Sequence, residues 1–421
     1  MPIERDAIRA AEGPAAPRHP HPVIYMVLIL PFGVIGGFLQ VCIAYLLAQA
    51  GLPVDRIAGL IAISYLPHTW KFLWAPVADI TLSRKSWYVI ACVMTAVGLW
   101  ATAALPATEN GLRVLTAVVL ISNVAVTFLG MSVESLMAYG ASEDEKGRAG
   151  GWFQAGNLGG TGIGGGIGLW LAQQLPLAWL SGAILGVGCL LCCFALMSVP
   201  EPVSPHRGER LGRNLLAVVR DLWDVARSKI GFLALFLCFL PIGSGAASGL
   251  WSAVANDWHA SANTVALVTG VIGGLASAAG CILGGFLSDR MNRQWAYALF
   301  GVVQALCAVT MALMPRVEST YVVFTLLYAV ATGLTYAGFS AFVLEAMGRG
   351  AAATKYNVFA SLSNTPIAYM TTVDGWAHTQ YGPAGMLYTE ALFALGGLVL
   401  FTVVFSAARR FWRVETDAAP A

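Results

Sequence analysis

The sequence predicts an all-α membrane protein with 12 transmembrane helices, arranged as two six-helix pseudo-symmetric bundles. Three observations support this fold class: the composition, the number of long apolar runs, and one long polar stretch near the middle of the chain. Of the 421 residues, 57% are hydrophobic and 11% are charged, and the mean hydropathy is +0.70. Average soluble domains have roughly 25% charged residues. The chain therefore has too few charged side chains for a water-facing surface, whereas lipid is a suitable solvent for it.

The apolar runs are long enough to cross a bilayer, which takes about 20 residues in a helix. In chain order they are about 23–50, 54–80, 87–105, 112–138, 149–174, 177–199, 230–255, 262–287, 294–314, 320–346, 352–376 and 384–408. Turn signals such as Gly51-Leu-Pro53 and Tyr381-Gly-Pro383 separate them. The first run is too long for a signal-peptide core and no small-residue cleavage site follows it, so we interpret it as a retained membrane helix.

Positively charged residues are distributed unevenly between the two predicted sides. Twenty Lys and Arg residues lie in the loops and tails of one side, against Arg56, Arg113 and Arg316 on the other. This asymmetry predicts that both termini are cytoplasmic in a multi-pass inner-membrane protein. The expected parts are a cytoplasmic tail (1–22), a first six-helix bundle (23–199), a cytoplasmic linker with an amphipathic helix (200–229), a second bundle (230–408) and a second tail (409–421). We expect a monomer.

Several function classes receive no support from the sequence. The net charge of +2 gives no indication of nucleic-acid binding, and the eight cysteines lie in apolar runs without C-x-x-C spacing, which favours small buried side chains over a metal site or disulfides. No phosphate-binding G-x-x-x-x-G-K-[ST] loop of a primary pump is present, and no nucleophile–base pair of an enzyme is visible. We therefore expect no enzyme activity, no cofactor and no metal.

A glycine-rich segment in the fifth run formally matches G-x-G-x-x-G from Gly160 to Gly165. It lies inside a predicted spanning helix with no preceding strand, which argues against dinucleotide binding. Glycines 156, 160, 164 and 168 instead recur every four residues. This spacing predicts a face of small residues for close helix packing.

Acidic residues repeat at half the chain length. Asp79 and Asp289 are 210 residues apart, and Glu134 and Glu345 are 211 apart. The segment from Gly285 to Arg293, which includes Asp289 and Arg290, resembles the cytoplasmic loop signature G-x-L-x-D-R-x-G-R of the major facilitator superfamily, with Asn292 in place of the last Gly. The first half keeps Asp79 and a displaced Arg84. The resemblance implies the major facilitator superfamily fold and a gating role for these loop residues; a solvated loop charge is the alternative.

Two further segments resemble one group within that superfamily. Lys71-Phe-Leu-Trp-Ala-Pro-Val-Ala-Asp79 is similar to the K-F-L-W-A-P-x-x-D signature of AmpG-type muropeptide permeases and their acetyl-coenzyme A transporter relatives; siderophore importers share it. The segment 351–363 resembles the group's S-A-T-Q-[FY]-A-L-x-S-x-L-S sequence, with Lys355 and Asn357 as departures, and 142–148 resembles its E-E-x-G turn. The resemblance implies a proton-driven symporter of cell-wall fragments.

Lys71 is a single cation in an apolar run, where a charge needs a partner, a wet cavity or a function. It can bind an anionic group of the substrate, pair with an acid on a neighbouring helix, or extend toward the interface. His68 and Tyr65 lie on the same predicted helix face, one and two turns away. They are candidate pathway residues, although packing explains them equally well.

Buried acids are the candidates for proton coupling. Glu134 and Glu345 lie near the predicted inner ends of apolar helices, and either can alternatively be the partner of Lys71. Asp374 and Glu390 lie near the outer ends of the last two runs, where we expect exposure at the interface or, alternatively, a role in proton entry. Other polar residues in the spans can line a pathway or bond between helices: Gln40, Asn123, Gln154, Asn157, Tyr336, Asn357 and Asn364.

Taken together, the residues and the resemblance predict a secondary transporter that moves a polar or anionic small molecule, such as a muropeptide, by proton-coupled symport and alternating access. Siderophore import, acyl-coenzyme A transport and drug efflux by proton antiport are the alternatives, since a fold does not determine direction. A non-transporting membrane receptor or a membrane enzyme is the hypothesis from a different class.

Overall fold

The computed structural model describes residues 20–106, 108–140, 146–201, 216, 220, 223, 227–347 and 358–417. Within these ranges the regular secondary structure is helical, and eight stretches are long and apolar enough to cross a membrane. The predicted amphipathic helix of the linker and the 142–148 turn fall largely outside the described residues.

The first half of the chain begins with one long helix. It runs through α2 (Val23–Gly37), a π-helical segment η1 (Phe38–Ile43) and α3 (Ala44–Gln49). The other helices of this half are α4 (Val54–Ile80), α5 (Arg84–Ala104), α6 (Glu109–Gly140), α7 (Lys146–Gly162), the π-helical η3 (Ile163–Ile167), α8 (Gly168–Gln174), α9 (Trp179–Leu191) and the 3-10 helix η4 (Cys192–Ser198). The six predicted spans of this half are therefore helical.

The second half contains helices of more uneven length. They are α11 (Lys229–Cys238), the short 3-10 helices η5 (Ala246–Gly249) and η6 (Ala255–Trp258), α12 (Ala262–Thr264), the π-helical η7 (Val265–Ile272), α13 (Gly273–Arg290), α14 (Arg293–Leu313), α15 (Glu318–Met347) and α17 (Asn364–Asp417). Asn292 starts α14 by accepting hydrogen bonds from the backbone N–H groups of Gln294 and Trp295. This capping role gives a physical reason for Asn at the position where the loop signature has Gly.

The prediction of a continuous helix over 230–255 is wrong. The helix ends at Cys238 and the chain continues irregularly to the short η5 and η6. Pro241 has no backbone N–H to donate, and Gly243 and Gly245 have φ values of 60° and 68°, which are left-handed conformations that glycine adopts without strain. The apolar character of the run is retained, but its backbone is broken halfway.

The eight membrane-length stretches and the twelve predicted spans are consistent with one another. The α17 stretch contains two helices joined at Gly382, whose backbone leaves the helical region (φ 71°, ψ −172°). The 27-residue α4 and the α7–η3–α8 helix are also long, but they contain more polar residues and glycine than the other spans. Short α11 accounts for the remaining difference.

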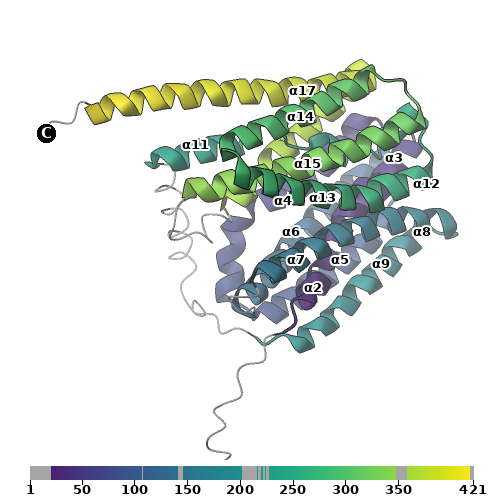
Figure 1. Ribbon diagram of the computed structural model, residues 1–421. Coiled ribbons are helices and arrows are strands. Elements are labelled where there is room, and N and C mark those ends of the chain that lie inside the picture. Colours follow the sequence, from purple (N-terminus) through teal and green to yellow (C-terminus); the bar gives the residue numbers. More distant parts are fainter. Residues whose placement is uncertain are drawn as a thin grey trace, which may run out of the picture.

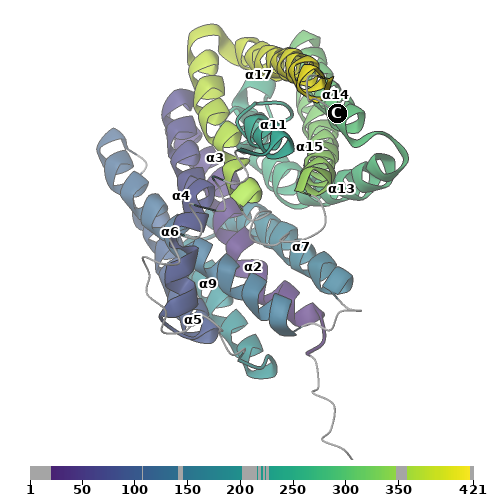
Figure 2. The same cartoon turned by 90° about the vertical axis from the view of Figure 1, so that its left-hand side faces the viewer.

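The helices gather into two bundles that follow the chain halves. The purple and blue helices of the first half lie together, and the green and yellow helices of the second half form the other group (Figures 1 and 2). In the first bundle α2 packs on α7, and α5 packs on α6 and α9; in the second, α15 packs on α13 and α14. The bundles meet mainly where α4 contacts α17 and where η3 contacts η7.

The predicted glycine face of the fifth run is confirmed, and it packs against α2. A Cβ atom added at Gly156, Gly160 or Gly164 would lie 2.3, 2.4 or 1.9 Å from a backbone oxygen of α2. Such distances are possible only for residues without a side chain, so the two helix backbones are in direct contact.

The contact between the bundles also relies on glycine. A Cβ at Gly270 in η7 would lie 2.6 Å from the Cα of Gly166 in η3, and a Cβ at Gly166 would lie 2.7 Å from the Ala266 oxygen. At the end of the molecule that carries Gly51 and Gly382, here called the Gly51 end, Gln49 donates to Asn256 (2.9 Å) and the Asp55 N–H donates to Thr379 (3.3 Å). These contacts join the halves at the Gly51 end.

Candidate functional site

A cavity of about 340 Å³ lies between the two bundles. Its volume is at the lower end of the range of about 300–1,000 Å³ that is usual for small-molecule sites. Helices of the first half contribute Phe32, Gln40, Ser64, Tyr65, His68, Asn123, Asn157 and Thr161, and the second half contributes Ser248, Trp251, Thr269, Ser277, Thr325, Thr332, Tyr336 and Asn364. Both halves therefore reach the space that a bound solute would occupy.

The polar groups that line this cavity are hydroxyls, amides and one imidazole. No Asp, Glu, Lys or Arg is among the described residues that line it. The aromatic rings of Phe32, Tyr65, Trp251 and Tyr336 complete the wall. Such a lining offers many hydrogen-bond donors and acceptors together with apolar ring faces, but no full charge.

In the first half, α4 presents Tyr65 and His68 to the cavity from consecutive turns. Gln40 donates to the Tyr65 hydroxyl (3.1 Å), and His68 Nε2 lies 3.2 Å from Asn123 Oδ1. The Asn123 amide nitrogen donates to the Val119 carbonyl (2.9 Å), which can only accept, so the amide oxygen is the atom that faces His68. His68 Nε2 is then the donor. The Phe32 ring packs edge-on against His68, with centroids 5.3 Å apart.

In the second half, the broken seventh span brings backbone and Trp251 to the cavity. Gly245, Ser248 and Trp251 all line it. A Cβ at Gly243 would lie 2.6 Å from Thr335 on α15, so the absence of side chains lets this segment approach α15 closely. Irregular backbone at membrane depth is tolerated where it is buried in protein or lines a cavity, which is the situation here.

Most predicted pathway residues line the cavity. They are Gln40, Tyr65, His68, Asn123, Asn157, Tyr336 and Asn364. Gln154 does not; its side chain is exposed on α7. Asn357 lies outside the described residues. The hydroxyls of Ser248, Thr269, Ser277, Thr325 and Thr332 had no distinguishing signal in the sequence, because Ser and Thr commonly bond within membrane helices.

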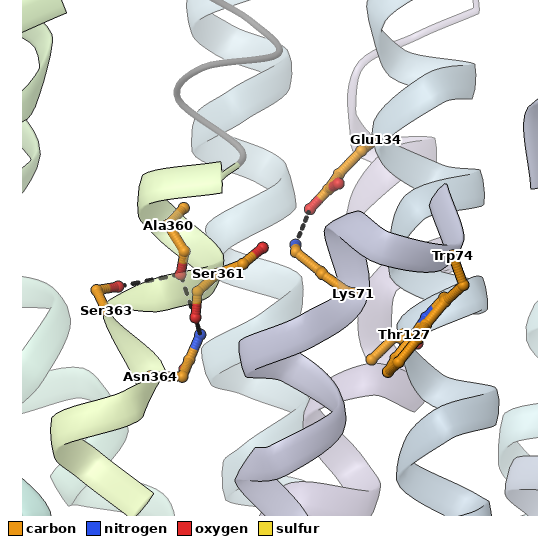
Figure 3. A network of polar contacts seen from close by, with 8 residues as sticks. All are labelled: Lys71, Trp74, Thr127, Glu134, Ala360, Ser361, Ser363 and Asn364. Carbon is orange, nitrogen blue, oxygen red and sulfur yellow. Dashed lines mark hydrogen bonds and ion pairs between the residues drawn. The ribbon is translucent and has the colours of Figure 1, made fainter. Parts of the chain in front are cut away.

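Lys71 is not among the cavity residues, and it takes the second of its predicted roles. Its Nζ lies 3.3 Å from Glu134 Oε1 on α6, and the two side chains are 18% and 34% exposed. Figure 3 shows this pair, with the Ser361 side chain from the second half pointing toward Lys71. Trp74 donates to Thr127 (3.0 Å) between the same two helices. Lys71 thus holds α4 to α6 in this state.

The last two helices bury two acids. We expected Asp374 and Glu390 to be exposed at the interface, but they are 0% and 3% exposed. The kink at Gly382 folds the second helix of α17 back along the first, and this covers both side chains. The Tyr328 hydroxyl donates to Glu390 Oε1 (2.7 Å), and Ser244 lies 3.4 Å from the same oxygen.

The loop-motif residues lie at helix ends. Arg84 is buried, and its guanidinium donates to the Ala78 carbonyl (2.6 Å) in the last turn of α4, while its backbone N–H donates to Glu201 (2.8 Å). Arg290 lies over the Phe286 ring, 3.4 Å from the centroid. Asp289 is exposed, Gly285 is half-buried in α13, and Arg293 starts α14. The side chains of Asp79 in α4 and Glu345 in α15 are outside the described part.

The sequence matches a family model over most of its length. The model of the Major Facilitator Superfamily covers residues 23–371. The chain belongs to the Major Facilitator Superfamily. This superfamily membership agrees with the two bundles and the cavity between them, and it makes the chain a membrane transporter by family.

Individual relatives and solved structures are more distant. The anhydromuropeptide permease of Escherichia coli strain K12 is 23% identical over 383 residues, which cover 84% of this chain and 74% of the permease. Among solved structures, a D-xylose-proton symporter aligns with a TM-score of 0.68 at 15% identity, over 90% of this chain and 95% of that one. The nucleoside transporter NupG aligns with a TM-score of 0.66 at 13% identity, over 91% and 98%. These structures share the superfamily fold.

Proposed function

We propose that this chain is a secondary transporter of a sugar-containing polar solute, of the anhydromuropeptide class, which it moves across the inner membrane together with protons by alternating access. The observation that carries the proposal is the cavity between the bundles, whose described lining combines hydroxyls, amides and aromatic rings and includes no Asp, Glu, Lys or Arg. A sugar ring presents hydroxyls around its edge and C–H groups on its faces, which match these two kinds of wall. The permease relative supports the same substrate class.

The uncharged character of the described lining also makes some of the alternative substrates less suitable than others. An acyl-coenzyme A carries several phosphates, and no described cation lines the cavity to compensate for them. Lys71, the nearest candidate on α4, is already engaged by Glu134. The anionic groups of a muropeptide would therefore lie outside this cavity, or would have to compete with Glu134 for Lys71.

The test is exchange of labelled solute in proteoliposomes that contain the purified protein. Vesicles loaded with unlabelled anhydromuropeptide should take up labelled anhydromuropeptide, and siderophores and acyl-coenzyme A should not compete. If anhydromuropeptides neither exchange nor stabilise the protein against heat, the proposed substrate class is wrong. Exchange of one of the competitors instead would identify the alternative.

A matched pair of variants on α7 tests the cavity. Asn157→Leu removes a polar group that lines the cavity, whereas Gln154→Leu makes the same kind of change outside it. Loss of one hydrogen bond costs about 1–3 kcal/mol, so the half-saturating concentration should rise roughly 5- to 150-fold for Asn157→Leu. It should stay unchanged for Gln154→Leu. Equal effects of the two changes would remove the cavity from the proposal.

A further inference from the structure

The two buried acids of α17 lie at the same level in a helical hairpin. Asp374 comes eight residues before the Gly382 kink and Glu390 eight residues after it. At 1.5 Å per residue, each lies about 12 Å from the turn. The helices run in opposite directions, so equal distances from the kink bring the two carboxyl groups close enough for their charges to act on each other.

Neither acid pairs with a cation in the described part of the chain. Both oxygens of Asp374 and Oε2 of Glu390 are buried and receive no hydrogen bond from any donor in the described part of the chain. Among the described residues, the other ionisable side chains that act on the pair are Tyr328 on α15 and Tyr369 on α17, and neither is a cation. The pair therefore differs from Glu134, which has Lys71 as its partner.

Charged groups on the surrounding elements are engaged elsewhere. His378, one turn beyond Asp374, has its Nε2 2.7 Å from Asp257 Oδ2 in η6. On α4, which packs against Gly375, the Asp55 carboxylate accepts from the Arg56 backbone N–H. On α14, the buried Gln304 bonds Thr332 and Thr335. No described cation lies at hydrogen-bond distance from either acid.

Two carboxylates cannot both stay ionised at such a site. A charge buried at membrane depth without a partner is costly, and a second charge of the same sign beside it adds repulsion. One bound proton removes one of the charges and makes that carboxyl group a donor to its neighbour. Resting on the transport function proposed above, we propose that Asp374 and Glu390 together form the proton-binding site of the transport cycle.

The pair is connected to the solute cavity through Tyr328. The Tyr328 hydroxyl bonds Glu390, and its ring packs edge-on against Trp251 of the cavity wall, with centroids 5.3 Å apart. Thr325 and Thr332, three residues before and four after Tyr328 on α15, also line the cavity. A solute that moves Trp251 or α15 therefore changes the groups that contact Glu390.

The pair is also next to the contact between the bundles. Gly375 follows Asp374, and a Cβ at Gly375 would lie 2.2 Å from the Cβ of Ala58 on α4. Loss of the proton would leave an additional charge one residue from this close contact. Release of the proton to water requires the contact to open, and uptake of a proton permits it to close. No covalent bond other than the O–H bond of the acid changes in this step.

The experiment separates proton coupling from transport itself. Asp374→Asn and Glu390→Gln imitate the protonated acids and fix the pair in an uncharged or singly charged form. In proteoliposomes these variants should keep solute exchange at equal pH on both sides, which needs no net proton movement, but lose accumulation driven by a pH gradient. The matched control is Glu318→Gln, an exposed acid of the same half that already accepts from Ser261 and Thr264; it should retain both activities.

Three outcomes decide the proposal. Gradient-driven accumulation at the wild-type level in Asp374→Asn and Glu390→Gln would overturn it. If a variant loses exchange as well, infrared difference spectra of the wild-type protein decide, because a shared proton requires a protonated-carboxyl band that disappears in Asp374→Asn or Glu390→Gln; its absence refutes the pair. Wild-type protein that fails in exchange would refute the transport function instead, and wild-type exchange without any proton movement would refute coupling by this pair.

Discussion

At the scale of single residues, the Lys71–Glu134 pair shows how a charge is kept within a membrane helix. The two groups are partly buried at 3.3 Å and belong to neighbouring helices. Coulomb attraction offsets part of the cost of removing each charge from water. Removing one partner leaves the other uncompensated, and this costs more than removing both.

Because removing one partner costs more than removing both, single and double substitutions of the Lys71–Glu134 pair should differ in stability. Lys71→Gln and Glu134→Gln should each lower thermal stability, by about 1–3 kcal/mol if the remaining group is left unsatisfied. The double variant should be less impaired than the sum of the two. Thermal unfolding in detergent measures the loss of stability, and solute uptake measures the loss of transport.

The control for this cycle is Thr127→Val, which removes the Trp74 hydrogen bond between the same two helices without leaving a charge. It should have a smaller effect than either single charge removal. Simple additivity of the Lys71 and Glu134 changes would show that the pair does not contribute as a unit.

Residues differ in how well the sequence alone reveals them. Lys71 could be singled out as a candidate site residue because a cation in an apolar run is unusual. Glu134 could be named as its possible partner because few acids lie in the predicted spans. The burial of Asp374 and Glu390 could not be predicted, because it depends on how the hairpin at Gly382 is rotated against α15. The hydroxyls that line the cavity resemble the many that bond to their own helix.

At the scale of elements, the direct contact of α2 and α7 has the clearest sequence origin. Glycines spaced every four residues fall on one helix face, and that face meets the α2 backbone. The same reasoning failed for the seventh span, where the length of the apolar run outweighed Pro241, Gly243 and Gly245 in the prediction. Hydropathy indicates which segment of a chain favours the lipid phase, but it does not indicate where the helix in that segment is interrupted.

A pair of alanine substitutions on one helix tests the α2–α7 contact. At Gly164 the added Cβ would lie 1.9 Å from the Val34 oxygen, whereas at Gly159 it meets nothing within 4 Å. Gly164→Ala should destabilise the protein by about 1–3 kcal/mol, as overpacking usually does. Gly159→Ala should be neutral or stabilising, by up to about 1 kcal/mol, because alanine favours the helix.

Thermal unfolding of both variants in the same detergent gives the comparison. A Gly164→Ala protein as stable as Gly159→Ala would contradict the close approach of the two helices. On α2, a Cβ at Gly33 would lie 2.0 Å from the backbone oxygen of Asn157. Gly33→Ala should therefore destabilise the protein as Gly164→Ala does.

At the scale of the whole molecule, the structure shows one state of a two-bundle transporter. Hydrogen bonds join the bundles at the Gly51 end, where Gln49 bonds Asn256 and Asp55 bonds Thr379. With the predicted orientation, this end faces away from the cytoplasm. Alternating access then requires these contacts to break and re-form in each cycle.

A chemical cross-link across the Gly51 end tests this requirement. Gln49→Cys combined with Asn256→Cys should react with a short bifunctional thiol reagent, since the side chains they replace are in contact at 2.9 Å. Cross-linked protein should lose transport because the end cannot open, and a cleavable reagent should restore transport on reduction. The measurement is solute exchange before and after cleavage.

The Gln49→Cys and Asn256→Cys variants on their own, treated with the same reagent, control for reactions of the eight native cysteines. They should keep their activity. Full exchange by the cross-linked double variant would mean that the Gly51 end does not open during transport.

The overall architecture follows largely from the sequence, because membrane thickness and hydropathy determine the helices and the internal repeat suggests the two bundles. The residues that face the cavity between the bundles depend instead on helix rotation and on a few close backbone contacts. Seven of the predicted pathway residues line the cavity, since polar side chains in spans tend to avoid lipid. Among the described residues, Lys71 and Gln154 are the exceptions: Lys71 pairs with Glu134, and Gln154 is exposed on α7.

The contact between Gly166 and Gly270 has a further consequence for motion. Interlocking side chains resist sliding, because each must leave one groove before it enters the next. Where the two π-helical segments meet, Gly166 and Gly270 present bare backbone to each other, so no side chain of either residue hinders a movement of one segment over the other. A side chain at Gly166 or Gly270 would collide with the opposite segment, so substitutions at either glycine should slow the conformational cycle while leaving each half folded.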